Sequence, residues 1–351
     1  MFESLGFETL TPRGASVYLA LILGALFGLL AERTAFCLRR AVVGEDRRQA
    51  AGVWLMALAV AVAGTQAAAV AGLIDFGDHR LTTGSLPLLA LVAGGLAFGT
   101  GMVLTRGCIS RLTVLGAGGN LRAFFVLALF AIVAHATLKG ALTPLRTVLS
   151  GFTVELGASA NLATWAGGPL LWSAVIALPA LAVALTSGNR PGRLILAAMI
   201  GALVPLGWIG TGYVLLDEFD PIAMESLSFI APWTETLFWT IASTAIEPGF
   251  GTGLIGGVLV GALVSTLIAG RFRWQSFETP RQTGRYAAGA VLMGVGGVLA
   301  GGCTVGAGLA GVPTLGLSAL IALASIVAGA ALAARVLGEA GGTSALPVPA
   351  E

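Results

Sequence analysis

Two stretches of the sequence decide the fold: residues 94–111, GGLAFGTGMVLTRGCISR, and residues 289–308, GAVLMGVGGVLAGGCTVGAG. Each is an apolar, glycine-rich run that leads into a glycine-flanked cysteine, Cys108 or Cys303. A helix can break at membrane depth only where protein or a water-lined cavity satisfies the freed backbone groups. The two stretches therefore predict membrane helices that break before they complete the crossing.

The composition around these stretches excludes a soluble globular domain. Of the 351 residues, 56% are hydrophobic and only 10% are charged, whereas soluble domains carry about 25% charged residues. High hydrophobicity also excludes disorder, and the glycines follow no collagen period. The formal net charge is only +2, and we expect no nucleic-acid partner. What remains is an all-α polytopic membrane protein.

The apolar runs predict nine membrane-spanning helices, each near the length of roughly 17 to 25 residues that a crossing requires. They cover residues 14–31, 50–74, 87–105, 121–138, 168–187, 194–215, 252–270, 286–300 and 314–336. Segments 149–165 and 233–247 are too short or too polar to span, and we expect re-entrant or interfacial helices there. The N-terminus, MFESLGFETLTPRGA, is acidic where a signal peptide is basic, so the first run is expected to remain as a span.

The basic residues predict the orientation. Nine alternating crossings leave only four of the 19 basic residues on one side, namely Arg13, Arg80, Lys139 and Arg146, and put the rest on the other. Because cytoplasmic loops carry the excess of Lys and Arg, the arginine-rich side is predicted to be cytoplasmic. The acidic stretch from Asp217 to Glu235 then lies outside, the N-terminus is periplasmic and the C-terminus is cytoplasmic.

This orientation makes the two cysteine stretches approach from opposite faces. Similar motifs on opposite faces are typical of an inverted-topology repeat. We therefore expect one membrane domain over residues 1–351, with pseudo-repeats at 14–140 and 190–337 and a disordered tail at 338–351. A weaker match pairs residues 21–40, LILGALFGLLAERTAFCLRR, with residues 253–274, GLIGGVLVGALVSTLIAGRFRW.

The broken helices carry residues suited to an anion that is soft at one end and hard at the other. A thiol is a soft, polarizable group, and hydroxyls such as those of Thr304 and Ser110 bind oxyanion oxygens. The alternative is that the cysteines are small residues at helix contacts. From its context alone Cys37 fits this alternative best, as a buried cysteine at a helix end whose neighbouring arginines anchor the membrane topology.

Three motifs together resemble the YeeE/YedE family of bacterial transporters for thiosulfate and related sulfur compounds. They are residues 27–41, FGLLAERTAFCLRRA, residues 100–124, TGMVLTRGCISRLTVLGAGGNLRAF, and residues 301–320, GGCTVGAGLAGVPTLGLSAL. The resemblance implies an hourglass-shaped inner-membrane protein that takes up thiosulfate. It also implies that cargo passes along Cys37, Cys108 and Cys303 by S–H···S contacts, and that a TusA-like cytosolic sulfur-carrier protein is a partner. The site carried over from the family comprises Cys37, Cys108, Cys303, Gly107, Gly302 and Thr304.

One departure from the family keeps the substrate open. Many members carry a histidine where this sequence has Ala307, so selenium compounds, sulfite and persulfides stay alternatives to thiosulfate. A membrane thiol oxidoreductase is a second class, although no two cysteines are close in sequence. A soft-metal transporter is a third, for which three cysteines and two histidines are a poor ligand set. We expect a transporter rather than an enzyme, with no cofactor and no resident metal.

Overall fold

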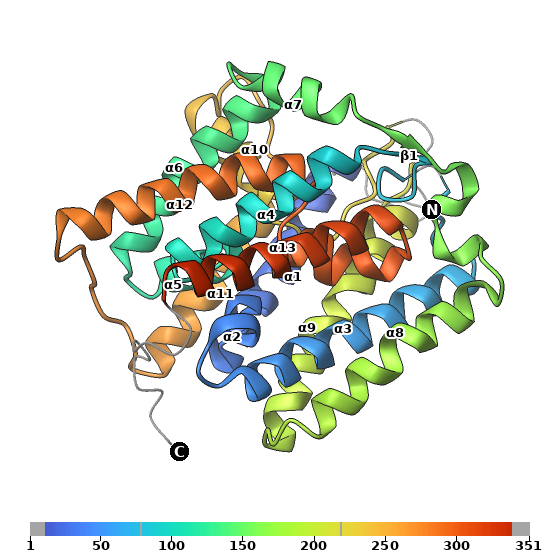
Figure 1. Cartoon of the computed structure of the whole chain (residues 1–351), viewed down its shortest axis with the longest axis horizontal. Helices are drawn as coiled ribbons and strands as arrows, with labels where there is room; N and C mark the ends of the chain where they lie inside the picture. The colour runs from blue at the N-terminus through green and yellow to red at the C-terminus, as the bar shows by residue number, and fades with distance from the viewer. Residues whose placement is uncertain (1–10, 78, 218–219, 339–351) are drawn as a thin grey trace.

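The computed structural model describes residues 11–77, 79–217 and 220–338 (Figure 1). Two strands pair in antiparallel fashion, β1 (Ser85–Leu86) and β2 (Val154–Glu155). The α-helices of the described residues are α1 (Pro12–Thr34), α2 (Leu38–Val43), α3 (Arg47–Val70), α4 (Leu88–Leu104), α5 (Ile109–Ala117), α6 (Leu121–Lys139), α7 (Thr143–Ser150), α8 (Gly168–Leu185), α9 (Pro191–Ile209), α10 (Ile230–Ile241), α11 (Phe250–Ile268), α12 (Pro280–Leu299) and α13 (Leu317–Val336). Two π-helices, η4 (Gly210–Val214) and η5 (Thr304–Gly311), follow α9 and α12, and the 3-10 turns are η2 (Gly157–Ala160), η3 (Leu162–Thr164) and η6 (Val312–Thr314).

Within the described residues, nine helical segments are long and apolar enough to cross a membrane. This confirms the predicted class and number of spans. Helix α12 begins at Pro280, well before the start that hydropathy predicts at residue 286. The reason is that Thr279 caps the helix by accepting a hydrogen bond from the Gln282 N–H, and Arg281 and Arg285 then occupy its first turns. Charged residues at the end of a helix lower the local hydropathy, so a hydropathy pattern places the start of the helix too late.

Neither of the two short segments forms a membrane-spanning helix, as expected from their length and polarity. Residues 149–165 hold the end of α7, strand β2 and two 3-10 turns. Helix α10 has 12 residues, which at 1.5 Å per residue is about 18 Å, too short for a hydrocarbon core of about 30 Å. The predicted tail at 338–351 lies outside the described residues except for Gly338.

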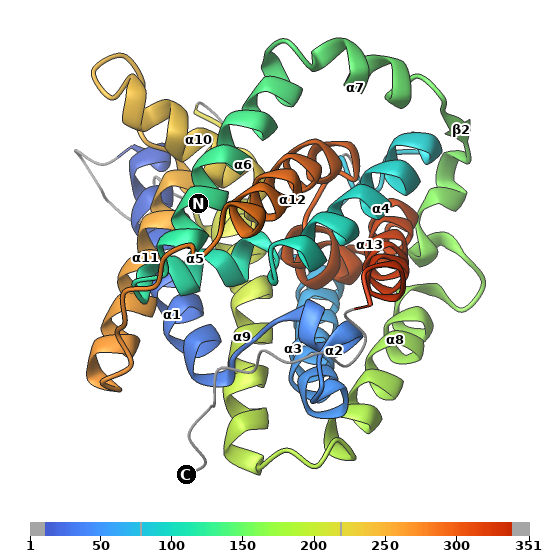
Figure 2. The ribbon, with the colours of Figure 1, turned by 60° about the vertical axis from the view of Figure 1, so that its left-hand side comes forward.

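Helices α4 and α12 cross in close antiparallel contact in the middle of the molecule, with α13 beside α4 (Figures 1 and 2). A Cβ atom at Gly94 would lie 2.7 Å from the carbonyl oxygen of Gly296, and one at Gly296 would lie 2.6 Å from that of Gly94. The same reciprocal relation joins Gly101 and Gly289, at 2.6 and 2.9 Å. Only glycine allows two helix backbones to approach this closely.

The two segments around this crossing share one order of elements. Helix α4, a break, α5 and α6 are followed later by helix α12, a break, η5 and α13. The ends of α4 and α12, the two cysteines, and the starts of α5 and η5 are each 195 residues apart. The packing also corresponds, because α6 packs on α12 and α13 packs on α4.

The remaining long helices pack around this centre. Helices α1 and α11 lie side by side and parallel, since a Cβ at Gly24 would meet the Leu254 oxygen at 2.3 Å and one at Gly261 would meet the Ala25 oxygen at 1.9 Å. Helix α3 contacts both α8 and α9, and α9 contacts α1. In Figure 1, α3 and α8 run together along the lower right of the molecule.

Candidate functional site: a buried sulfur and hydroxyl cluster

All three cysteines occupy the same local position in the backbone. Each is the N-cap of a helix, and each lies two residues after a residue in the left-handed conformation that ends the preceding helix. The left-handed residues are Ala35 (φ 52°) before Cys37, Arg106 (φ 60°) before Cys108 and Gly301 (φ 68°) before Cys303. The sequence signals this geometry only at Gly301, because alanine and arginine rarely adopt a positive φ.

Backbone hydrogen bonds fix these three breaks. The amide before each cysteine donates to a carbonyl five residues earlier, at 3.1 Å in every case: Phe36 to Ala31, Gly107 to Met102 and Gly302 to Gly297. This is the Schellman ending of a helix. The chain then turns directly into the next helix, whose first N–H groups have no partner within the helix. Each thiol is thereby held at the positive end of a helix.

Three distant parts of the chain meet at Cys108. Its thiol hydrogen-bonds the thiol of Cys37 and the hydroxyl of Thr304, and its Sγ lies 3.2 Å from the Ser110 Oγ. Thr304 directly follows Cys303 in the sequence. We call the set Cys37, Cys108, Cys303, Ser110 and Thr304 the sulfur cluster.

Cys303 occupies the other end of the sulfur cluster. Its Sγ accepts a hydrogen bond from the Gly306 N–H at 3.3 Å and another from the backbone of Phe229, the N-cap of α10. The neighbouring Ser228 Oγ lies 3.0 Å from the position that a Cβ would take at Gly306. The start of α10 therefore joins the site, which no motif in the sequence indicates.

The sulfur cluster is closed to solvent. Cys37, Cys108 and Cys303 are 4%, 1% and 0% exposed. Ser110 and Thr304 are also buried. Any solute that passes between these groups must displace side chains or open the helix breaks.

A cavity of about 170 Å³ reaches the Cys303 end of the cluster. Gly301 and Ala307 line it, and the Ala307 N–H donates to the Cys303 carbonyl at 2.8 Å. Two cations line it as well. Arg80 donates through Nη1 to the Gly301 carbonyl at 3.2 Å, and the Nε of Arg146 is buried without a hydrogen-bond partner among the described residues. We call this space the arginine cavity.

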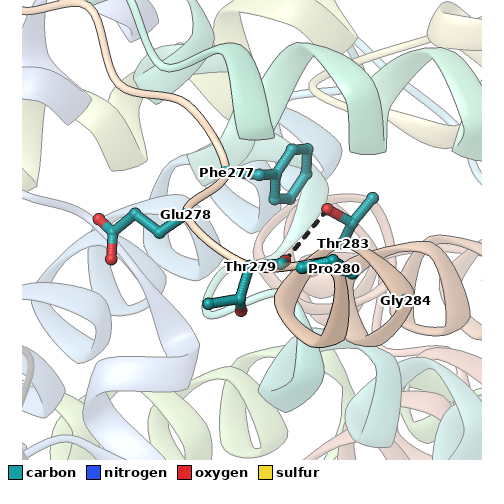
Figure 3. A pocket seen from close by; sticks show the side chains of 6 residues that line it. All are labelled: Phe277, Glu278, Thr279, Pro280, Thr283 and Gly284. Atoms are coloured by element: carbon teal, nitrogen blue, oxygen red, sulfur yellow. Dashed lines mark hydrogen bonds between the residues drawn. The ribbon is translucent and has the colours of Figure 1, made fainter.

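A second cavity, of about 480 Å³, lies at the start of α12 (Figure 3). It is lined by Phe277, Glu278, Thr279, Pro280, Thr283 and Gly284, and the Thr283 hydroxyl donates to the Thr279 carbonyl at 3.4 Å. Figure 3 shows the Glu278 side chain pointing away from Phe277 and Thr283. The segment before α4 that lines the arginine cavity lies 195 residues earlier in the chain, the same spacing that separates Cys108 from Cys303. The second cavity has no counterpart of Arg80 among its lining residues.

The structure thus brings together four of the six residues expected at the site. Cys37, Cys108, Cys303 and Thr304 converge. Gly107 and Gly302 lie instead in the backbone of the breaks, where each donates its N–H to the preceding helix, and a Cβ at Gly302 would lie 2.6 Å from the Ala307 nitrogen.

Sequence patterns miss one charged neighbour of the cluster. Arg111 counts in the sequence as one of the arginines that anchor the cytoplasmic side, yet it lies on α5, one turn after Cys108. Its guanidinium interacts electrostatically with Cys37 and Cys108. The spacing Cys-x-x-Arg at a helix start is the signal that identifies it, once the break at Cys108 is recognised.

The geometry brings two thiols together that are distant in the sequence. The three cysteines are free thiols, and it is Cys37, rather than Cys303, that contacts the thiol of Cys108. Among the residues the structure describes, no three His, Cys, Asp or Glu side chains are grouped closely enough to hold a metal ion.

Comparison with known proteins places this site in a family. Residues 33–332 match the model of a protein family described as "Sulphur transport". The chain is 28% identical over 323 residues to the thiosulfate transporter TsuA of Spirochaeta thermophila, covering 87% of this chain and 94% of that protein. It is 27% identical over 317 residues to the thiosulfate transporter TsuA of Escherichia coli K12, covering 82% of this chain and 85% of that protein. The family match covers most of the chain, and nine helical segments of its described residues are long and apolar enough to cross a membrane, so the chain belongs to this sulphur transport family of multi-pass membrane proteins, which confirms the resemblance to YeeE/YedE proteins.

Proposed function

We propose that this protein takes up thiosulfate across the inner membrane, with the sulfur cluster as the path. The observation that carries the proposal is the convergence of Cys37, Cys108 and the Cys303–Thr304 pair from three distant segments onto one buried point. Thiosulfate pairs a soft terminal sulfur with hard oxyanion oxygens. Thiols suit the first, while hydroxyls, arginines and helix N-termini suit the second. The relatives named as thiosulfate transporters support this choice of cargo.

In the proposed path the anion enters the arginine cavity, meets Cys303, moves to Cys108 and leaves past Cys37. The cavity supports the first step because Gly301 and Ala307, which line it, flank the Cys303 turn. The shared order of elements and the antiparallel crossing of α4 and α12 support an inverted repeat with halves at 14–140 and 190–337. The N-terminus is then periplasmic, and a TusA-like carrier would receive the cargo at the arginine-rich cytoplasmic face.

Growth tests this function. A bacterial host that lacks its own thiosulfate uptake should grow with thiosulfate as its sole sulfur source only when it carries this protein. Labelled thiosulfate uptake should then be competed by unlabelled thiosulfate more strongly than by sulfite, selenite or a persulfide. If the protein reaches the membrane and no thiosulfate enters, the proposal is wrong. Stronger competition by one of the other compounds would reassign the cargo.

The arginine cavity leads to a prediction about substrate capture. Replacing Arg80 or Arg146 by glutamine removes a cation that faces the entering anion, and hydrogen bonds to charged groups contribute about 1.5 to 3 kcal/mol. Because the cavity is open to water, we expect a smaller loss, a rise in KM for uptake of about three- to tenfold with little change in the maximal rate. Arg13→Gln is the matched control, since Arg13 lies on the same side of the membrane in the proposed orientation and does not line the cavity. An unchanged KM in both cavity variants would contradict this entry route.

A carboxyl beside Arg80 makes capture dependent on pH. Burial raises the pKa of Glu225 to about 7, the Glu235 carboxylate adds to the increase and the Arg80 guanidinium opposes it. As pH rises from about 6 to about 8, Glu225 gains its negative charge and offsets that of Arg80. Thiosulfate stays a dianion throughout, and His79 stays neutral because burial lowers its pKa to about 4. The KM for uptake should therefore rise with pH. In Glu225→Gln, the KM should stay at the low value of the wild type at about pH 6 across this range. A pH profile that keeps its slope in Glu225→Gln would assign the dependence to another group.

A further inference from the structure

Arg111 is a partly buried cation beside the sulfur cluster, and one of its donor atoms has no partner in the described part of the chain. Its Nη1 atom is buried and has no hydrogen-bond partner among the residues the structure describes. The guanidinium lies near Cys37, Cys108, Glu32 and Arg40. An ionisable side chain inside a membrane span is costly, and such residues face an interior path and pair with an opposite charge. The charge of Arg111 therefore calls for an anion.

One oxygen of the nearby Glu32 carboxylate is engaged by other residues. The Glu32 Oε2 accepts a hydrogen bond from the Ser265 hydroxyl at 2.8 Å and forms an ion pair with Arg271 Nη2 at 3.0 Å. Arg40, the other nearby charge, pairs with Asp46 and adds positive charge rather than compensating it. The hydrogen-bonding capacity of the Arg111 Nη1 is therefore left for a group that the protein itself does not supply.

The position of Arg111 matches a two-ended ligand. Two thiols, those of Cys37 and Cys108, hydrogen-bond each other close to the guanidinium. A guanidinium offers several N–H donors in a planar fork that fits an oxyanion, whereas thiols contact a soft sulfur. At the corresponding place in the second half, 195 residues later, the chain has Gly306, so only the Cys37–Cys108 end carries this cation.

We propose that Arg111, Cys37 and Cys108 form an oxyanion subsite, in which the guanidinium binds the sulfonate oxygens of a thiosulfate-like anion while the two thiols hold its terminal sulfur. This rests on the proposed function for the identity of the anion. The subsite is the last one before the cytoplasmic face, and it selects sulfur anions that carry an oxyanion group over neutral sulfur compounds.

Equilibrium binding and stability of the purified protein test the subsite. We expect thiosulfate to raise the melting temperature of the wild-type protein, and Arg111→Gln to weaken thiosulfate binding at least about tenfold. Arg111→Lys keeps the charge but not the fork, so it should bind with intermediate affinity. Arg273→Gln, an exposed arginine in the loop after α11, is the control that should bind like the wild type.

The ligand-free proteins provide an independent measurement. Because the Nη1 atom of Arg111 is buried without a hydrogen-bond partner within the described residues, Arg111→Gln should raise the melting temperature of the ligand-free protein above that of the wild type. A lower melting temperature together with unchanged thiosulfate affinity would show a purely structural arginine and overturn the subsite. If the wild type binds no thiosulfate and Arg111→Gln is still more stable, the proposed cargo is wrong while the anion requirement of Arg111 stands.

Discussion

Replacing Cys108 by serine is expected to lower thiosulfate uptake at least about tenfold, which corresponds to about 1.4 kcal/mol in the transport barrier. Cys108 is the residue at which the three motifs meet, through contacts to Cys37, Ser110 and Thr304. A serine hydroxyl has nearly the same volume but is a hard donor with a shorter reach, and it interacts less favourably with a soft sulfur atom. It would also engage the hydroxyls of Ser110 and Thr304 more strongly, which would keep the path closed.

The measurement is uptake of labelled thiosulfate in cells that lack their own transporter, scaled to the amount of protein in the membrane. All three cysteines of the chain belong to the sulfur cluster, so the matched control removes a sulfur atom elsewhere. Met199→Leu does this on the outer face of α9, where Met199 is 47% exposed, and should leave uptake unchanged. Uptake at the wild-type level by Cys108→Ser would remove the thiol relay from the mechanism.

The sequence predicts the spans and the two glycine-bracketed breaks because both depend on local composition. Runs of apolar residues determine which segments enter the membrane, and the glycines at Gly301 and Gly302 mark a turn directly. The break before Cys108 has Arg106 in the left-handed conformation, but Gly107 still marks it. The break before Cys37 has no glycine, because Ala35 adopts the positive φ and Phe36 precedes the cysteine. The residues around Cys37 therefore look like an ordinary helix end. From these residues alone Cys37 fits a packing role, and only the family resemblance places it in the site.

Similarity between two helices also arises when they pack against each other. Residues 21–40 and 253–274 look alike because α1 and α11 pack against each other along glycine faces, with Gly24 on one and Gly257 on the other. Each helix needs small residues on the face that contacts the other. In the order of elements, α11 lies before α12 and α3 lies before α4. Contacts between distant segments, such as that of Phe229 with Cys303, also leave no local signal in the sequence.

A substitution at the crossing of α4 and α12 is expected to destabilise the protein strongly. Adding one methyl group in Gly296→Ala should destabilise the protein by about 1 to 3 kcal/mol or more, in the range of overpacked cores. The new Cβ would lie 2.5 Å from the Phe98 nitrogen and 2.6 Å from the Gly94 oxygen. Both atoms belong to helix backbone, so a side-chain rotation cannot relieve the contact and the helices must separate. Both helices end at a cysteine break, and their separation should also displace Cys108 from Thr304.

A second glycine provides the matched control for this substitution. Gly256, on α11, has no atom within 4 Å of the position a Cβ would take, and alanine favours a helix by up to about 1 kcal/mol over glycine. Gly256→Ala should therefore unfold at the same or a higher temperature than the wild type in detergent, whereas Gly296→Ala should unfold at a lower one. Because the contact is reciprocal, Gly94→Ala should lower the stability in the same way. The Gly94→Ala, Gly296→Ala double variant should lose less stability than the two single variants added together, since one separation of the helices accommodates both methyl groups. Equal stability of Gly296→Ala and Gly256→Ala would mean that the two backbones do not touch, and the alignment of the two cysteine breaks would then need another cause.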